Sequence, residues 1–149
     1  MSKIFPNKLP EYILNDYKRN AEVMVFNALK EAKLYSTQEV FYSASWLNTV
    51  IHGDAQSDGE CDFIVTDSDI GIIYIEVKGG IITKDANNLW YSNGKEIKNP
   101  IEQAKKSKHV ITKEFINRWN KKFPLERNPS LFRGHFVIFP NSSIEFIKI

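Results

Sequence analysis

Apolar residues at helical spacing mark the first third of the chain. Between Pro10 and Ala32 they recur every three or four positions, at Leu14, Tyr17, Ala21, Met24, Val25, Ala28, Leu29 and Ala32. This spacing gathers them on one face of a helix, where they can pack against a core. The pattern predicts a single amphipathic helix over residues 10–32.

A second helix is predicted from its start signals. Asn99 can cap the helix, Pro100 suits its first turn, and Glu102 stands three residues after the cap. The sequence that follows, as far as Trp119, is rich in helix-forming residues. We therefore expect this helix over residues 99–119.

Between and after these helices, short runs of aromatic and β-branched residues predict strands. The predicted strands cover residues 38–47, 61–66, 71–78, 131–140 and 143–149. Residues 131–140 are expected to form a buried strand that Pro140 ends. Asn93-Gly94, between short strand-like pieces in residues 89–97, predicts a tight hairpin. The order helix, strand, strand, strand, hairpin, helix, strand predicts an α/β fold with a mixed central sheet.

Composition adds limits on the class of protein. A chain of 149 residues, 42% hydrophobic and 26% charged, is typical of one globular domain, here expected over residues 1–149. The C-terminus ends on an apolar, strand-like segment, so we also considered that the chain is the N-terminal part of a longer protein. No signal peptide and no membrane-spanning segment is recognised, which predicts no membrane partner.

The single cysteine and the charge distribution change the picture further. Cys61 excludes an internal disulfide and a cysteine-based zinc site, which fits a cytoplasmic protein. By strand alternation Cys61 faces away from Asp62, and we interpret it as a small core residue. The net charge is only +2, but residues 99–122 carry seven basic residues and two acidic ones.

Two carboxylates are brought together by the hairpin that residues 61–78 predict. Asp62 and Glu76 each stand seven positions from Asp69, in the middle of the acidic turn. A hairpin centred on Asp69 therefore makes them direct or nearly direct cross-strand neighbours. A register that differs by one residue would keep them close but could separate their faces.

Adjacent carboxylates repel each other unless a positive charge lies between them. A hard cation such as magnesium, usually held by one or two carboxylates, is the natural solution. Lys78 lies on the same strand face as Glu76 and could assist the attacking water or neutralise charge on a phosphate. The alternative is an exposed strand end on which Glu76 and Lys78 form a solvated pair.

The ordered set Glu22, Asp62, Glu76-Val77-Lys78 and Gln103 resembles the PD-(D/E)xK nuclease superfamily, and more closely its NERD (nuclease-related) domain. The similarity covers residues 20–115 and includes "AEVMVFNALK", "ECDFIV", "GIIYIEVKGG" and "NPIEQAKKSKHVI". It implies a restriction-endonuclease-like core. The proline that names the superfamily motif is absent before Asp62, where Glu60-Cys61 stand.

The resemblance also implies roles for individual residues. Asp62, Glu76 and the backbone carbonyl of Val77 would be the metal ligands for Mg²⁺ or Mn²⁺, and Lys78 the catalytic lysine. Glu22 would lie near the metal or orient the water, and Gln103 would sit at the edge of the site. From the residues alone, a boundary residue of its helix is the plainer interpretation of Glu22. Gln103 could equally be a helix-start residue bonded to backbone.

The function expected is a metal-dependent nuclease, with DNA the expected substrate. Lys105, Lys106 and Lys108 would contact phosphates near the positive end of their helix, although a solvated helix face is the plainer interpretation. The alternative function is a non-catalytic nucleic-acid-binding module that serves a fused or partner helicase or ATPase. A homodimer was considered, because cutting both strands of a duplex needs two sites.

Overall fold

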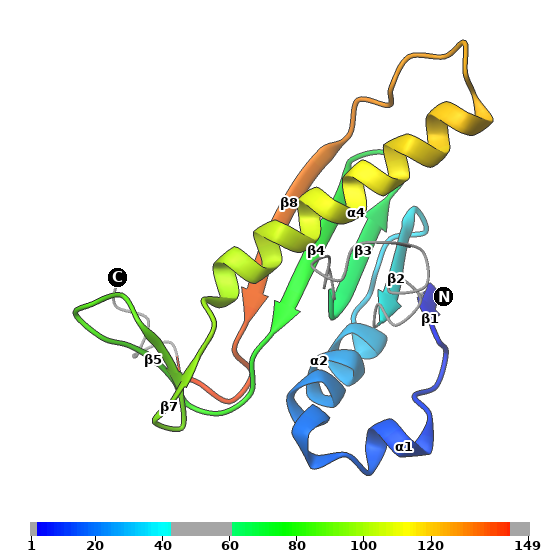
Figure 1. The fold of residues 1–149 in the computed structure, drawn as a ribbon. Coiled ribbons are helices and arrows are strands. Elements are labelled where there is room, and N and C mark those ends of the chain that lie inside the picture. Colours follow the sequence, from blue (N-terminus) through cyan, green and yellow to red (C-terminus); the bar gives the residue numbers. More distant parts are fainter. Residues whose placement is uncertain (1–2, 43–60, 144–149) are drawn as a thin grey trace.

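The computed structural model describes residues 3–42 and 61–143. Its main sheet has five strands in the order β1-β2-β3-β4-β8 (Figure 1). Strand β1 is parallel to β2, β4 is parallel to β8, and β2, β3 and β4 are antiparallel neighbours. The sheet is therefore mixed, as predicted. Its strands are β1 (Lys3–Phe5), β2 (Gln38–Tyr42), β3 (Phe63–Asp67), β4 (Gly71–Val77) and β8 (Phe132–Ile138).

A second, smaller sheet lies beyond the C-terminal ends of β4 and β8 (Figure 1). It contains the antiparallel strands β5 (Ile82–Lys84), β6 (Trp90–Ser92) and β7 (Lys95–Ile97). The predicted Asn93-Gly94 hairpin joins β6 to β7, and both turn residues have positive φ, 49° and 80°. That backbone suits the two-residue hairpin turn that Asn-Gly favours, so the prediction is confirmed.

The predicted helix over residues 10–32 is broken into three pieces. They are α1 (Glu11–Leu14), the 3₁₀ helix η1 (Tyr17–Arg19) and α2 (Asn20–Glu31). The break lies at Asn15-Asp16, where the Asp16 carboxylate accepts a hydrogen bond from the backbone N–H of Lys18. Such a local bond competes with helical hydrogen bonding, so a continuous helix was wrong at this point.

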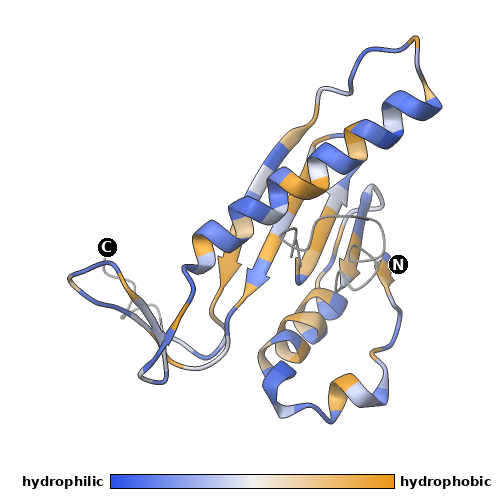
Figure 2. Cartoon of the chain, viewed as in Figure 1, coloured by the Kyte–Doolittle hydropathy of each residue, from blue (hydrophilic) through white to orange (hydrophobic). Residues whose placement is uncertain are grey.

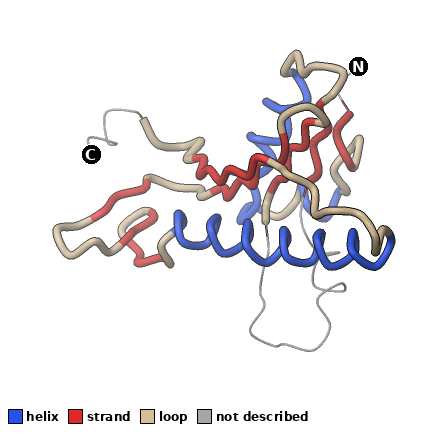
Figure 3. The backbone as a smooth tube through the Cα atoms, turned by 90° about the horizontal axis from the view of Figure 1, so that it is seen from above, coloured by secondary structure: helices blue, strands red, loops and turns tan. Residues whose placement is uncertain are grey.

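The second predicted helix is confirmed as α4 (Pro100–Lys122). The Asn99 side chain accepts hydrogen bonds from the backbone N–H groups of Ile101 and Glu102, as expected of a helix cap. Helix α4 lies along one face of the main sheet and α2 lies on the other (Figure 3). Hydrophilic and hydrophobic residues alternate along α4, whereas α2 is more uniformly hydrophobic (Figure 2).

The side chains of β4 alternate between two cores, one on each face of the sheet. Ile75 and Val77 join the larger core with α2, and Tyr74 joins a smaller one with Ile111 of α4. The larger core contains Ile4, Leu9, Ile13, Ala21, Val25, Phe26, Val40, Tyr42 and Phe63 as well. By the same alternation Glu76 lies on the face that α4 covers.

Strand β8 was predicted to be buried, and this was wrong. Phe132 and Phe136 are 61% and 55% exposed. In the described part of the chain β8 has one strand neighbour, β4. Phe136 pairs with Ile75, which belongs to the core on the α2 face, so by strand alternation both rings lie on the face opposite α4. Part of the strand predicted over residues 38–47, and nearly all of that over residues 143–149, lies outside the described residues.

One buried hydrogen bond ties α4 to the sheet and gives a test of the fold. The Tyr74 and Thr112 hydroxyls share a bond of 2.9 Å, and the Tyr74 side chain is fully buried. Tyr74→Phe leaves the Thr112 hydroxyl without this partner, so we expect the free energy of unfolding to fall by about 1–3 kcal/mol in a urea titration. The double variant Tyr74→Phe/Thr112→Val should recover most of that loss, because no hydroxyl is left without a partner. A double variant whose loss of stability equals the sum of the losses of the two single variants would contradict the prediction.

Candidate active site at the end of β4

Asp62 and Glu76 meet where the β3–β4 hairpin opens. Phe63 pairs with Ile75 in the antiparallel β3–β4 register. The next residues away from the turn, Asp62 and Glu76, therefore lie opposite each other, as their equal distance from Asp69 predicts. The Asp62 Oδ2 atom accepts a hydrogen bond of 2.7 Å from the backbone N–H of Val77. This bond holds the Asp62 carboxylate against the end of β4, beside Glu76.

Lys78 lies against Glu76, as their shared strand face predicts. The Lys78 Nζ atom is 2.8 Å from Glu76 Oε1, and the two side chains are 25% and 7% exposed. An exposed Glu–Lys pair at a strand end would be mostly solvated, whereas the Glu76 side chain is buried. The geometry therefore favours a built site over the solvated pair that the sequence left open.

The electrostatics of Asp62 show a site short of positive charge. Burial, and then the negative charges of Glu76 and Glu22, raise the pKa of Asp62 to about 8, against an ordinary value of 3.8. The Val77 N–H and the Lys78 ammonium act in the opposite direction and do not balance these effects. A cation placed among these carboxylates would reverse the shift.

Glu22 approaches the same region from α2 but is held by two other residues. Its Oε2 atom accepts a hydrogen bond from the Tyr42 hydroxyl and lies 3.7 Å from the Arg19 guanidinium. Arg19 also donates to the Tyr42 oxygen at 3.2 Å. Burial and the bond to Glu22 raise the pKa of Tyr42 above its ordinary value, so the hydroxyl stays a donor to Glu22.

Sequence reasoning missed Tyr42 and Arg19 as site residues. Arg19 stands three positions before Glu22, a spacing that brings two helical side chains together and that could have suggested the ion pair. Tyr42 offered a weaker signal, because alternation along β2 turns it inward with Val40 but does not say which helix faces it.

The two glycines after Lys78 let α2 and the small sheet approach β4. A Cβ atom added to Gly79 would lie 2.9 Å from the Cβ atom of Ala21, the neighbour of Glu22 in α2. Gly80 has φ of +82°, a conformation that other residues rarely adopt. Gly79 thus permits the close contact that brings the start of α2, and with it Glu22, to the end of β4.

Gln103 belongs to the first turn of α4, and the start of this helix lies near the C-terminal ends of β4 and β8 (Figure 1). Its Oε1 atom is buried and has no hydrogen-bond partner among the described residues. Buried amide oxygens usually have a partner, so this one has room for a donor that the protein does not supply. Its proximity to the carboxylates remains a prediction.

Lys105 and Lys106 are both exposed on α4, and Lys108 is half-buried. Burial, followed by the charges of Lys108 and Lys105, lowers the pKa of His135 on β8.

Cys61 is fully buried, and burial raises the pKa of its thiol to about 12, so it is a core residue as interpreted from the sequence.

The carboxylates fit a magnesium-like ion better than a dense protein cage. No group of three or more His, Cys, Asp or Glu side chains in the described residues gathers closely enough to hold a metal ion. Asp62 and Glu76, with the Val77 carbonyl, would supply a partial ligand set. Magnesium commonly takes one or two carboxylates and leaves its other positions to water and substrate phosphate.

None of the helices in the described residues combines the length and the apolar character that a membrane span requires.

No curated protein and no solved structure matches the chain. The family model of the nuclease-related domain matches residues 18–140, a range that contains Glu22, Asp62, Glu76, Lys78 and Gln103. The chain therefore belongs to the nuclease-related domain (NERD) family.

Proposed function

We propose that this chain is a divalent-metal-dependent nuclease that hydrolyses phosphodiester bonds of nucleic acid, with DNA the expected substrate. The observation that carries the proposal is the Glu76–Lys78 contact of 2.8 Å beside a second carboxylate, Asp62, whose charge lacks a full counterion. This acid–acid–lysine arrangement, in which Glu76 is buried and Asp62 and Lys78 are half-buried, offers both a place for a cation and a cation of its own.

Asp62, Glu76 and the Val77 carbonyl would hold Mg²⁺ or Mn²⁺, which when bound acidifies water and stabilises negative charge on phosphate. Lys78 binds the phosphate oxygens and stabilises the charge that grows on them during hydrolysis. The Lys78 ammonium now neutralises Glu76. With a metal held by Glu76, the ammonium would be available to the phosphate. Glu22 would orient water, and Tyr42 and Arg19 hold its carboxylate in place.

A non-catalytic module that serves a helicase or ATPase is the competing function. A phosphate-binding surface has no physical need for two adjacent carboxylates, which repel phosphate when no metal is present. The charge deficit around Asp62 therefore favours the enzyme. Cytoplasmic location and homodimer formation stay predictions.

The test is cleavage of supercoiled plasmid and of labelled oligonucleotides by the full chain. We expect cleavage with Mn²⁺ or Mg²⁺ and none with EDTA, because the carboxylates need a metal to act on phosphate. Lys98→Ala, an exposed change outside the site, should cleave like the wild type. Tight DNA binding without cleavage of any nucleic acid, at any divalent-metal concentration, would favour the binding module instead.

A further inference from the structure

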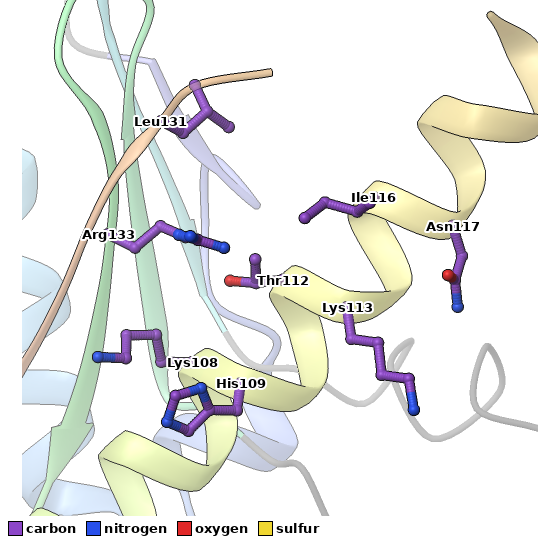
Figure 4. Close-up of a pocket in the computed structure, with 8 residues that line it drawn as sticks. All are labelled: Lys108, His109, Thr112, Lys113, Ile116, Asn117, Leu131 and Arg133. Carbon is purple, nitrogen blue, oxygen red and sulfur yellow. The ribbon is translucent and has the colours of Figure 1, made fainter. Parts of the chain in front are cut away.

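A basic groove lies between α4 and β8, apart from the carboxylates. It has a volume of about 540 Å³. Figure 4 shows Lys108, His109, Thr112, Lys113, Ile116 and Asn117 of α4 on one side, with Leu131 and Arg133 at the β8 side. Three of these eight residues are Lys or Arg, and none is acidic. The groove is suited to an anion, and the proposed hydrolysis assigns it no role.

The groove and the carboxylates lie on the same face of the sheet. Arg133 pairs with Ile72 in the parallel β4–β8 register, and Ile72 shares its strand face with Glu76. Four positions separate Ile72 from Glu76, which corresponds to about 13 Å along the strand. Because α4 covers the buried Tyr74 between these two levels, one extended ligand would reach both places by following the β8 side of the helix.

Positive charge extends from the groove toward the carboxylates. Lys105 and Lys108 lie close enough to His135 to lower its pKa, after burial, and Glu102 opposes them more weakly. His135 pairs with Tyr74, halfway between the level of Arg133 and that of Glu76. A line of positive charge thus runs along α4 from near the site to the groove.

The groove is not uniformly charged. Ile116 and Leu131 give it an apolar wall beside the cations (Figure 4). A phosphate can contact Arg133 and Lys113, and a sugar or base can pack on the apolar wall. An acidic peptide would use the cations alone, so the mixed lining favours a nucleotide unit.

We propose that the groove formed by Lys113, Arg133, Ile116 and Leu131 binds the backbone of a nucleic-acid strand at a point distant from the bond that is cut. This inference rests on the proposed function for the position of that bond. With a rise of about 3.4 Å per nucleotide in a duplex strand, the separation corresponds to about four nucleotides. A strand must therefore have about that length to contact both the groove and the carboxylates.

The test measures binding by fluorescence anisotropy in EDTA, where no metal-dependent cleavage occurs. The full chain and its Lys113→Gln/Arg133→Gln variant are titrated with labelled oligonucleotides of three and twelve nucleotides over a range of salt. For the longer strand we expect weaker binding by the variant and a salt slope lower by about 1.4–1.8, the contribution of two phosphate contacts. The shorter strand can occupy the groove alone, so we expect the variant to bind it more weakly than the wild type as well.

Lys8→Gln/Lys33→Gln is the matched control, since it removes two exposed lysines far from α4 and β8 in the sequence. An equal fall in slope for this control, or binding of the oligonucleotides by the Lys113→Gln/Arg133→Gln variant that equals that of the wild type, would overturn the groove. Competition by polyglutamate as effective, charge for charge, as the oligonucleotide would overturn it as well. If the Arg133 change disturbs β8, the single variant Lys113→Gln, at an exposed position of α4, replaces the double variant in this test.

The two proposals fail in different ways. Cleavage by the wild type, with the groove variant binding like the wild type, would leave the nuclease standing and remove the groove. Loss of binding in the variant, without cleavage by the wild type, would support the groove and remove the nuclease.

Discussion

Lys78→Ala is expected to cleave nucleic acid about two to three orders of magnitude more slowly than the wild type, because a charge partner of the transition state is lost. Its metal affinity should survive or increase, since the ammonium that now lies 2.8 Å from Glu76 no longer competes with the metal. Nucleic-acid binding should change little, because one basic group among many is removed. Single-turnover cleavage and Mn²⁺ calorimetry on the same preparation measure these quantities separately.

Lys98→Ala is the matched control for that experiment, since it removes an exposed lysine from the segment between β7 and α4. It should leave both the rate and the metal affinity unchanged. A wild-type cleavage rate in Lys78→Ala would show that the lysine has no part in the chemistry, even if the metal site stands. Loss of metal binding in Lys78→Ala would show that the lysine organises the carboxylates rather than competing for them.

Asp62→Asn should lose metal binding and activity together while the metal-free protein becomes more stable. The asparagine oxygen can still accept the Val77 N–H bond, so the local structure has a reason to persist. Removing the charge relieves repulsion from Glu76 and Glu22. We expect a gain of about 0.5–2 kcal/mol in the free energy of unfolding in EDTA, a size common for stabilising changes at functional sites.

The pH dependence of this gain follows from the direction of the pKa shift. The pKa of Asp62 is about 8 in the folded chain and 3.8 ordinarily, so across that window the folded chain keeps a proton that the unfolded chain has released. The metal-free wild type therefore loses stability as pH rises through the window. Asp62→Asn lacks this loss, and its advantage should be greatest near pH 8.

Added Mn²⁺ provides the complementary measurement. It should raise the melting temperature of the wild type, increasingly so toward pH 8 as Asp62 loses its proton, and leave that of Asp62→Asn unchanged. Equal stability of the two proteins in EDTA at pH 8 would contradict the charge deficit. Equal stabilisation of both by Mn²⁺ would place the metal elsewhere.

The hairpin geometry was the part of the site most open to prediction from the sequence. Side-chain alternation and the symmetry of Asp62 and Glu76 about Asp69 depend on strand periodicity alone, and the β3–β4 register agrees with both. Asn99 and the Asn93-Gly94 pair act through local backbone geometry, which explains why the start of α4 and the hairpin turn were predicted correctly.

Features that depend on tertiary contacts were not predictable in the same way. The contact of Tyr42 and Arg19 with Glu22 requires α2 to lie on β2, and no periodicity shows that. Strand β8 reads as buried because its residues are apolar, yet its place at the edge of the described sheet exposes Phe132 and Phe136. Strands β1 and β5, of three residues each, are too short for periodicity to reveal.

The groove was only partly visible in the sequence. Lys108 and Lys113 stand on one helix, and the excess of basic residues there suggested phosphate contact. Arg133 comes twenty residues later, and only the packing of α4 on β8 brings it to the same cavity. The sequence therefore predicted the charge without the binding place.

The most direct test of the central claim is an anomalous diffraction experiment on crystals of the full chain grown with Mn²⁺. A metal held by the hairpin carboxylates should give one strong anomalous peak in contact with Asp62 and Glu76, with the Val77 carbonyl as a further ligand. The Lys78 ammonium should have moved away from Glu76. Crystals that bind manganese with no peak at these carboxylates, and with the Lys78–Glu76 contact intact, would contradict the account.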